Sequence, residues 1–174
     1  MADPFRFKQF SVNQSGCAMK INTDAVLLGA LAQAENPQNI LDIGTGTGIL
    51  ALVALKYGAS DVLGIDIGPL SVQAARDNMK ANRSSFDVLK ADIKKYRSKK
   101  TYDLVAANLI TEDLIEHSAR IVSFVKEGGL LAVSGISLGN LAKLRKSFSS
   151  LPLKCIKISR GQQWTGLLYQ KRMS

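Results

Sequence analysis

The chain has 174 residues, of which 46% are hydrophobic, and its 23 lysines and arginines against 14 acidic residues give a net charge of +9. This length fits one domain with a substantial core, and we find no 18-residue apolar run, no signal-peptide core and no cysteine framework, so we expect a cytoplasmic protein without a metal site. The positive charge favours an anionic partner such as RNA or a ribosomal particle.

The first part of the chain contains two predicted elements. Aromatic and polar side chains alternate in residues 5–12, as in a half-exposed strand at a lid or a sheet edge. Thr23 and Asp24 precede an apolar run and predict the capped start of a helix over residues 25–34. We assign residues 1–35 to an N-terminal lid and helix.

A strand, a glycine loop and a helix are predicted between residues 40 and 57. The strand contains Asp42, and the loop after it has the three glycines Gly44, Gly46 and Gly48. A dinucleotide fingerprint needs Gly or Ala where this chain has Ile49, and no Gly-Lys-Ser/Thr sequence is present to bind phosphates. The carboxylate of Asp42 favours a ligand with positive charge, such as S-adenosylmethionine. A tight turn in another kind of α/β protein is the alternative at this point.

Two further acidic residues come after predicted strands. Asp66 ends a second strand, about 20 residues downstream of the glycines, where a carboxylate accepts hydrogen bonds from ribose hydroxyls. Asp92 comes after a third strand at residues 86–89, where an adenine amino group could donate to it. Three acids in this order, the first with a glycine loop, indicate a positively charged ligand that contains a nucleoside.

A basic run begins just after Asp92. Residues 94–100 hold five positive charges and Tyr96. Such a run could bind phosphates. A solvated connection at the far edge of the sheet is the alternative, and it is the interpretation that we favour.

The predicted fourth strand, residues 102–110, is apolar except for Asn108, as expected of a central parallel strand. A carboxamide at the end of a buried strand either caps the turn at Thr111 or faces the ligand crevice, which lies at the carboxyl ends of the strands. After it we expect a helix over residues 112–126, stopped by two glycines. His117 lies within that helix and is interpreted as a surface or packing residue.

The remaining elements complete an α/β fold. A fifth strand is expected at residues 130–133 and an amphipathic helix at residues 138–148. Residues 153–158 and 164–169 read as two strands whose link is too short for a crossover helix, so they pair antiparallel. The sheet then has about seven strands, mostly parallel with a reversed last strand, and helices on both faces. We expect a ligand-binding core at residues 39–136 and a C-terminal helix and hairpin at residues 137–174.

The glycine loop and the strand-end acids resemble those of class I S-adenosylmethionine-dependent methyltransferases. The resemblance implies a Rossmann-like methyltransferase sheet with S-adenosylmethionine as cofactor, whose methionine carboxylate could lie at the start of the helix after Asp24. The residues that it assigns to the cofactor are Thr23, Asp24, Asp42, Gly44, Thr45, Gly46, Gly48, Asp66, Ile67, Asp92, Ile93 and Asn108.

Two more specific resemblances divide the chain. Residues 39–172 resemble the catalytic domain of the ribosomal protein lysine methyltransferases that modify the large-subunit stalk-base protein. The matching segments are Leu41 to Ala51, Gly64 to Ile67, Ala107-Asn108-Leu109, Gly128-Gly129-Leu130, Ser134-Gly135-Ile136 and Trp164 to Leu167. Residues 7–32 resemble the opening of the tRNA adenine amino-group methyltransferases that act next to the valine anticodon, through Phe7 to Phe10 and Cys17 to Asp24.

The sequence departs from each pattern in one respect. The adenine enzymes have Asn-Pro-Pro-Tyr after the fourth strand, whereas Asn108 is followed here by Leu109 and Ile110, without an aromatic ring to stack on a base. The ribosomal-protein enzymes have a separate N-terminal recognition domain, which this sequence lacks.

We therefore predict methyl transfer to an amine nitrogen of a protein, with Asn108 and Leu109 at the acceptor. The alternatives are a tRNA or rRNA adenine methyltransferase and a non-catalytic RNA-associated factor.

Overall fold

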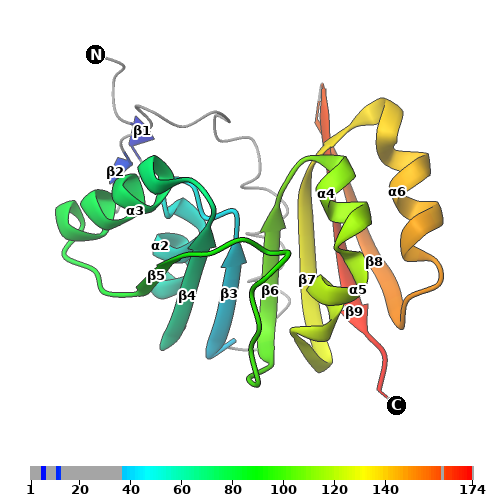
Figure 1. Ribbon diagram of the computed structural model, residues 1–174, viewed down its shortest axis with the longest axis horizontal. Helices are drawn as coiled ribbons and strands as arrows, with labels where there is room; N and C mark the ends of the chain where they lie inside the picture. The colour runs from blue at the N-terminus through cyan, green and yellow to red at the C-terminus, as the bar shows by residue number, and fades with distance from the viewer. Residues whose placement is uncertain (1–4, 7–10, 13–36, 162, 174) are drawn as a thin grey trace.

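The structure is a computed structural model, and it describes residues 5–6, 11–12, 37–161 and 163–173 (Figure 1). The first strands, β1 (Phe5–Arg6) and β2 (Ser11–Val12), pair antiparallel as a separate two-stranded sheet. The prediction of one strand over residues 5–12 is therefore wrong, because Phe5 lies opposite Val12 and the two segments run in opposite directions. Thr23, Asp24 and the helix expected at residues 25–34 lie outside the described residues.

A seven-stranded sheet forms the centre of the described molecule, in the order β5-β4-β3-β6-β7-β9-β8. Its strands are β3 (Asn39–Ile43), β4 (Asp61–Asp66), β5 (Asp87–Lys90), β6 (Tyr102–Asn108), β7 (Val125–Ser137), β8 (Leu153–Arg160) and β9 (Trp164–Lys171). Strands β3 to β7 pair in parallel, and β9 is antiparallel to both of its neighbours. The predicted sheet with a reversed last strand is confirmed.

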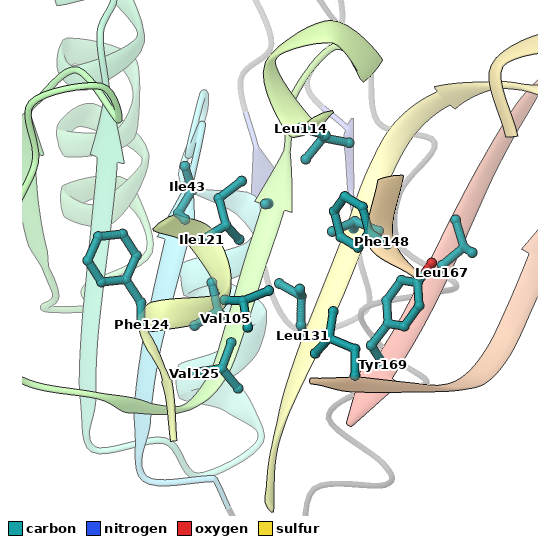
Figure 2. Close-up of a cluster of buried hydrophobic side chains, with 14 of the residues drawn as sticks. Ile43, Val105, Leu114, Ile121, Phe124, Val125, Leu131, Phe148, Leu167 and Tyr169 are labelled. Carbon is teal, nitrogen blue, oxygen red and sulfur yellow. The ribbon is translucent and has the colours of Figure 1, made fainter. Parts of the chain in front are cut away.

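Helices cover both faces of the sheet because successive residues of each strand are apolar on both sides. The helices α2 (Ile49–Lys56) and α3 (Pro69–Ala81) pack with Ile40 on one face. The helices α4 (Thr111–Glu116), α5 (Ser118–Ser123) and α6 (Leu141–Phe148, after the 3₁₀ turn Leu138–Asn140) pack on the other. Figure 2 shows this second layer, in which Leu114, Ile121 and Phe148 meet side chains of the sheet.

The segment between β6 and β7 differs from the predicted helix over residues 112–126. It forms two short helices that meet at His117, and β7 already begins at Val125, ahead of the two glycines expected to stop a helix. Within β7 the backbone is crowded at Gly129, where a Cβ atom would lie 2.8 Å from the main-chain oxygen of Lys126. The glycines thus permit an irregularity within β7.

In the described part of the chain, no helix is both long enough and apolar enough to span a membrane. The cytoplasmic location stays a prediction.

Candidate functional site

The site lies where the strand order reverses. Chain order runs outward from β3 through β4 to β5, and then returns to β6 on the other side of β3. In open α/β sheets the crevice for a ligand lies at this point, outside the carboxyl ends of the strands. The ends of β3, β4 and β6 bring the glycine loop, Asp66 and Asn108 to this one edge of the sheet (Figure 1).

The glycine loop is hydrogen-bonded to β4 and lies against the end of β6. The N–H groups of Gly44 and Thr45 donate to the main-chain oxygen of Ile65 at 2.9 and 3.1 Å. Gly44 has a φ of 73°, and a Cβ atom there would lie 2.7 Å from the main-chain oxygen of Asn108. Only glycine adopts this conformation without strain and without a clash against the end of β6. The loop therefore lies directly beside Asn108.

The other two glycines of the loop have different surroundings. A Cβ atom on Gly48 would lie 2.9 Å from the ring of Phe86 and 3.1 Å from Ala75, so this glycine permits tight packing under α3. Among the described residues, a Cβ atom on Gly46 would approach only the oxygen of Gly44, at 3.9 Å. The described part of the chain thus leaves room beside Gly46 for a ligand that approaches the backbone.

Asp66 connects the glycine loop to the end of β4. One carboxylate oxygen accepts a hydrogen bond from the N–H of Gly46 at 2.9 Å, and the other accepts one from Gly68 at 2.8 Å. Each oxygen keeps a second lone pair, and the side chain is partly exposed. The carboxylate can therefore hold the loop and still accept hydrogen bonds from a ligand.

Asp42 is a fully buried carboxyl group in this site. One of its oxygens accepts a 2.6 Å hydrogen bond from the hydroxyl of Thr45, while the other has no hydrogen-bond partner among the described residues. Burial raises the pKa of Asp42 to about 7. The hydrogen bond from Thr45 lowers this pKa in part, and the negative charge of Asp66 raises it by a smaller amount. A buried carboxyl without a partner on one oxygen, next to a second carboxylate, fits a ligand that brings positive charge and donors.

Asn108 lies at the end of β6 between the glycine loop and β7. Its side-chain oxygen accepts a hydrogen bond from the hydroxyl of Ser134, which is opposite it in the β6–β7 register, at 3.3 Å. Sequence reasoning missed this partnership, because the register of two strands separated by two helices cannot be read from spacing. Gly135 comes next, with a φ of 84°.

Two oxygen atoms converge beside Gly135. A Cβ atom there would lie 2.5 Å from the main-chain oxygen of Leu109 and 3.2 Å from the side-chain oxygen of Asn108. Leu109 itself is partly buried against the core, and the next residue, Ile110, is 53% exposed. The carboxyl end of β6 thus combines two hydrogen-bond acceptors with apolar side chains.

The remaining predicted cofactor residues lie at the ends of β4 and β5. The N–H of Ala91 donates to the main-chain oxygen of Asp66 at 2.9 Å, which fixes the segment after β5 against β4. Asp92 accepts a 2.8 Å hydrogen bond from the N–H of Lys94, and Ile93 packs against the core. Ile67 is 65% exposed, so it is available to a ligand.

The basic run at residues 94–100 is attached to the rest of the molecule. Lys94 forms a 3.5 Å ion pair with Glu116, and Lys100 forms one with Asp61. Arg97 donates to the main-chain oxygens of Lys94 and Tyr96. These contacts favour a connecting role over phosphate binding.

His117 is 8% exposed and lies where α4 and α5 meet, not within one helix. Its Nε2 atom is 3.7 Å from a carboxylate oxygen of Glu116, and ligand atoms of Asp113, Glu116 and His117 all lie within 4.8 Å of one another. Because Glu116 is also paired with Lys94, we interpret the group as a packing contact.

Comparison with known proteins gives one matching family. Residues 22–172 match the family described as ribosomal protein L11 methyltransferase (PrmA). A ribosomal protein L11 methyltransferase of Lactobacillus johnsonii is 37% identical over 153 residues, which are 86% of this chain and 48% of that protein. A solved structure of ribosomal protein L11 methylase from Lactobacillus delbrueckii subsp. bulgaricus is 28% identical with a TM-score of 0.79, covering 87% of this chain and 79% of that one.

A second group of relatives has a different substrate in its name. The tRNA1(Val) (adenine(37)-N6)-methyltransferase of Pedobacter heparinus is 45% identical over 113 residues, which are 62% of this chain and 47% of that protein. The chain spans about half the length of the curated relatives it matches. Both of the resemblances found in the sequence are thus present among its relatives.

Proposed function

Because the chain belongs to the family of ribosomal protein L11 methyltransferases (PrmA), we propose that it is an S-adenosylmethionine-dependent methyltransferase. The proposed acceptor is an amine nitrogen of a protein, either a lysine or an amino group of a ribosomal protein of the L11 type. One observation carries the choice of acceptor: the apolar, non-aromatic side chains of Leu109 and Ile110 follow Asn108, where the oxygens of Asn108 and Leu109 converge beside Gly135.

The carboxylates and the glycine loop are proposed to hold the cofactor. Asp66 would accept hydrogen bonds from its ribose hydroxyls, and Asp92 from its adenine amino group, with Ile67 and Ile93 against the base. Gly44, Thr45, Gly46 and Gly48 would form the wall beside its methionine part, together with Asp42. When bound, S-adenosylmethionine supplies a methyl group on a positively charged sulfur.

The proposed task of Asn108 is to aim the acceptor nitrogen. Its side-chain oxygen is held by the Ser134 hydroxyl, and the main-chain oxygen of Leu109 lies near it. Two fixed acceptors orient the N–H groups of an incoming amine, so the lone pair points in one direction. A lysine ammonium, with a pKa of about 10.4 in water, must first lose a proton, which an apolar surrounding favours because burial penalises the charged form.

A tRNA or rRNA adenine amino group is the second candidate acceptor. It is supported by the 45% identity to a tRNA adenine methyltransferase over 113 residues. The protein acceptor is favoured because Leu109 and Ile110 offer no aromatic face to a base, whereas an apolar wall suits the methylene stem of a lysine. A non-catalytic RNA-associated factor would use the same fold without transfer.

The test is to locate the transferred label. The protein is incubated with radiolabelled S-adenosylmethionine and a bacterial extract, and separate halves are treated with ribonuclease or protease before gel analysis. We expect label that survives ribonuclease and is lost to protease, with a band at the size of an L11-type protein. Label in a tRNA band would overturn the protein acceptor, and no label at all, with the cofactor bound, would favour the non-catalytic factor. Asp66→Ala is the control that removes cofactor-dependent labelling.

A further inference from the structure

The positive charge of the chain is concentrated at its C-terminal end. Residues 128–174 contain eight of the 23 lysines and arginines and none of the 14 acidic residues. Residues 1–127 contain the other 15 basic residues and all 14 acidic ones, so their net charge is +1 and the last 47 residues contribute +8. A surface with one sign of charge attracts a polyanion from a distance.

Six of these basic residues lie on two elements that follow each other in the chain, the helix α6 and the strand β8, and β8 is the last strand of the sheet order (Figure 1). We call them the α6–β8 basic surface: Lys143, Arg145, Lys146, Lys154, Lys157 and Arg160. All six are exposed, and in the described part of the chain none of them forms an ion pair with a carboxylate. The contrast with Lys94 and Lys100 is direct, because those two are neutralised by acidic partners.

The basic residues of β8 lie on both faces of the sheet. Among the described strands β8 pairs only with β9, and the register places Arg160 opposite Thr165 but Lys157 opposite Leu168, whose side chains belong to opposite faces. Lysines on an edge strand also discourage edge-to-edge association. That role does not account for the unpaired cations of α6 or for the lack of any acidic residue among them.

The surface leads toward the proposed site. Strand β8 is antiparallel to β9, which is antiparallel to β7, so β8 runs in the same direction as β7. Arg160, the last residue of β8, therefore lies at the side of the sheet where the parallel strands have their carboxyl ends. Trp164, the first residue of β9, lies at the same side opposite Ser137, and it is 40% exposed.

Because side chains alternate along β9, Trp164 is on the same face of the sheet as Leu168 and its register partner Lys157. Arg160, opposite Thr165, is on the other face. An exposed aromatic ring on one face with a lysine suits a single-stranded nucleic acid, whose bases stack while its phosphates pair.

From this arrangement we infer that the α6–β8 basic surface binds a single-stranded segment of RNA, with its backbone along β8 and a base against Trp164. The inference is separate from the proposed methyl transfer, because binding is measured without cofactor. Contacts to phosphates release counterions, so the affinity must fall steeply with salt.

The test compares two triple variants with the same net charge. Lys143→Gln, Lys146→Gln and Lys157→Gln remove cations from the surface, whereas Lys56→Gln, Lys80→Gln and Lys90→Gln remove three exposed lysines from α2, α3 and β5. Binding of a labelled single-stranded RNA of about 20 nucleotides is followed by fluorescence anisotropy at about 0.1 M salt. We expect the first variant to bind about tenfold or more weakly, with the slope of log K against log salt reduced in magnitude by about 2, and the second to change less than about twofold.

Two further measurements make the result decisive. The chain has one tryptophan, so its fluorescence reports on Trp164 alone and is expected to be quenched by the RNA. Circular dichroism checks that both variants are folded. Equal weakening in the two variants would overturn the inference, since only net charge would then matter. So would the absence of RNA binding by the parent, or binding to phosphatidylglycerol vesicles in its place.

Discussion

Asp42→Asn tests whether a buried carboxyl group lies beneath the glycine loop. The Asp42 side chain is fully buried, and burial raises its pKa from 3.8 to about 7. Because the pKa in the folded state is above that in the unfolded state, the folded state holds an extra proton between these two values. The contribution of this proton to the unfolding free energy is therefore fully present below about pH 4 and is lost as the pH rises to about 7.

The expected size comes from the same pKa values. One pKa unit corresponds to about 1.4 kcal/mol, so the difference between 3.8 and about 7 amounts to about 4 kcal/mol. Asparagine has nearly the same shape as a protonated aspartic acid and does not titrate. Between about pH 4 and pH 8 the parent should thus lose about 4 kcal/mol of unfolding free energy relative to Asp42→Asn, a large part of the 5–15 kcal/mol typical of a domain.

The assay is urea unfolding followed by circular dichroism at several pH values, for the protein without cofactor. Asp87→Asn, at an exposed position on β5, controls for the loss of one negative charge. The reasoning is refuted if the parent and Asp42→Asn keep a constant difference in stability across this pH range. In the same variant, calorimetry should show weaker binding of S-adenosylmethionine, because a cationic ligand favours the ionised carboxyl.

Three more substitutions separate cofactor binding from transfer. Asp66→Ala should weaken S-adenosylmethionine binding by about 2–3 kcal/mol, measured by calorimetry, because it removes charged hydrogen bonds; unchanged affinity would contradict the assignment. Asn108→Ala should lower turnover about 10²-fold or more while cofactor affinity is retained, since a positioning contact is lost; a parallel fall in affinity and stability would mean that Asn108 is a structural cap. Gly135→Ala should lower turnover as strongly, because the added methyl group would lie between the oxygens of Asn108 and Leu109. It should also lower the unfolding free energy by about 1–3 kcal/mol, because an alanine would be held at positive φ. Normal turnover in this variant would place the acceptor elsewhere.

The architecture was predictable because the relevant signals are local. Hydrophobic runs of strand length alternate with helical runs, and the first two strands are followed by glycines or end at an acidic residue, so the sequence alone predicts a parallel sheet whose ligand side is at the carboxyl ends of the strands. The two short helices on either side of His117 were not predictable. The sequence predicts one continuous helix over residues 112–126, and the break depends on how the chain returns to β7.

The site was predictable to the extent that it consists of strand ends. Asp42, Asp66 and Asn108 lie at the ends of separate strands, and parallel strands bring those ends together without any further information. The partnership of Asn108 with Ser134 and the convergence of oxygens at Gly135 depend on register, and a shift of one residue would change both. Such details require coordinates.

The nature of the acceptor depends on features that are not local to the glycine loop. The ribosomal protein L11 methyltransferases and the tRNA adenine methyltransferases among the relatives are both methyltransferases by name, so a loop and acids that hold the methyl donor cannot distinguish a lysine from an adenine. The distinction rests on the two residues after Asn108, since Leu109 and Ile110 provide apolar surface. A basic surface at one end of the sheet does not require the acceptor to be RNA. A protein acceptor that is itself bound to RNA would bring phosphates to α6 and β8 while it presents an amine to Asn108, so an RNA-binding surface and a protein acceptor are compatible in one enzyme.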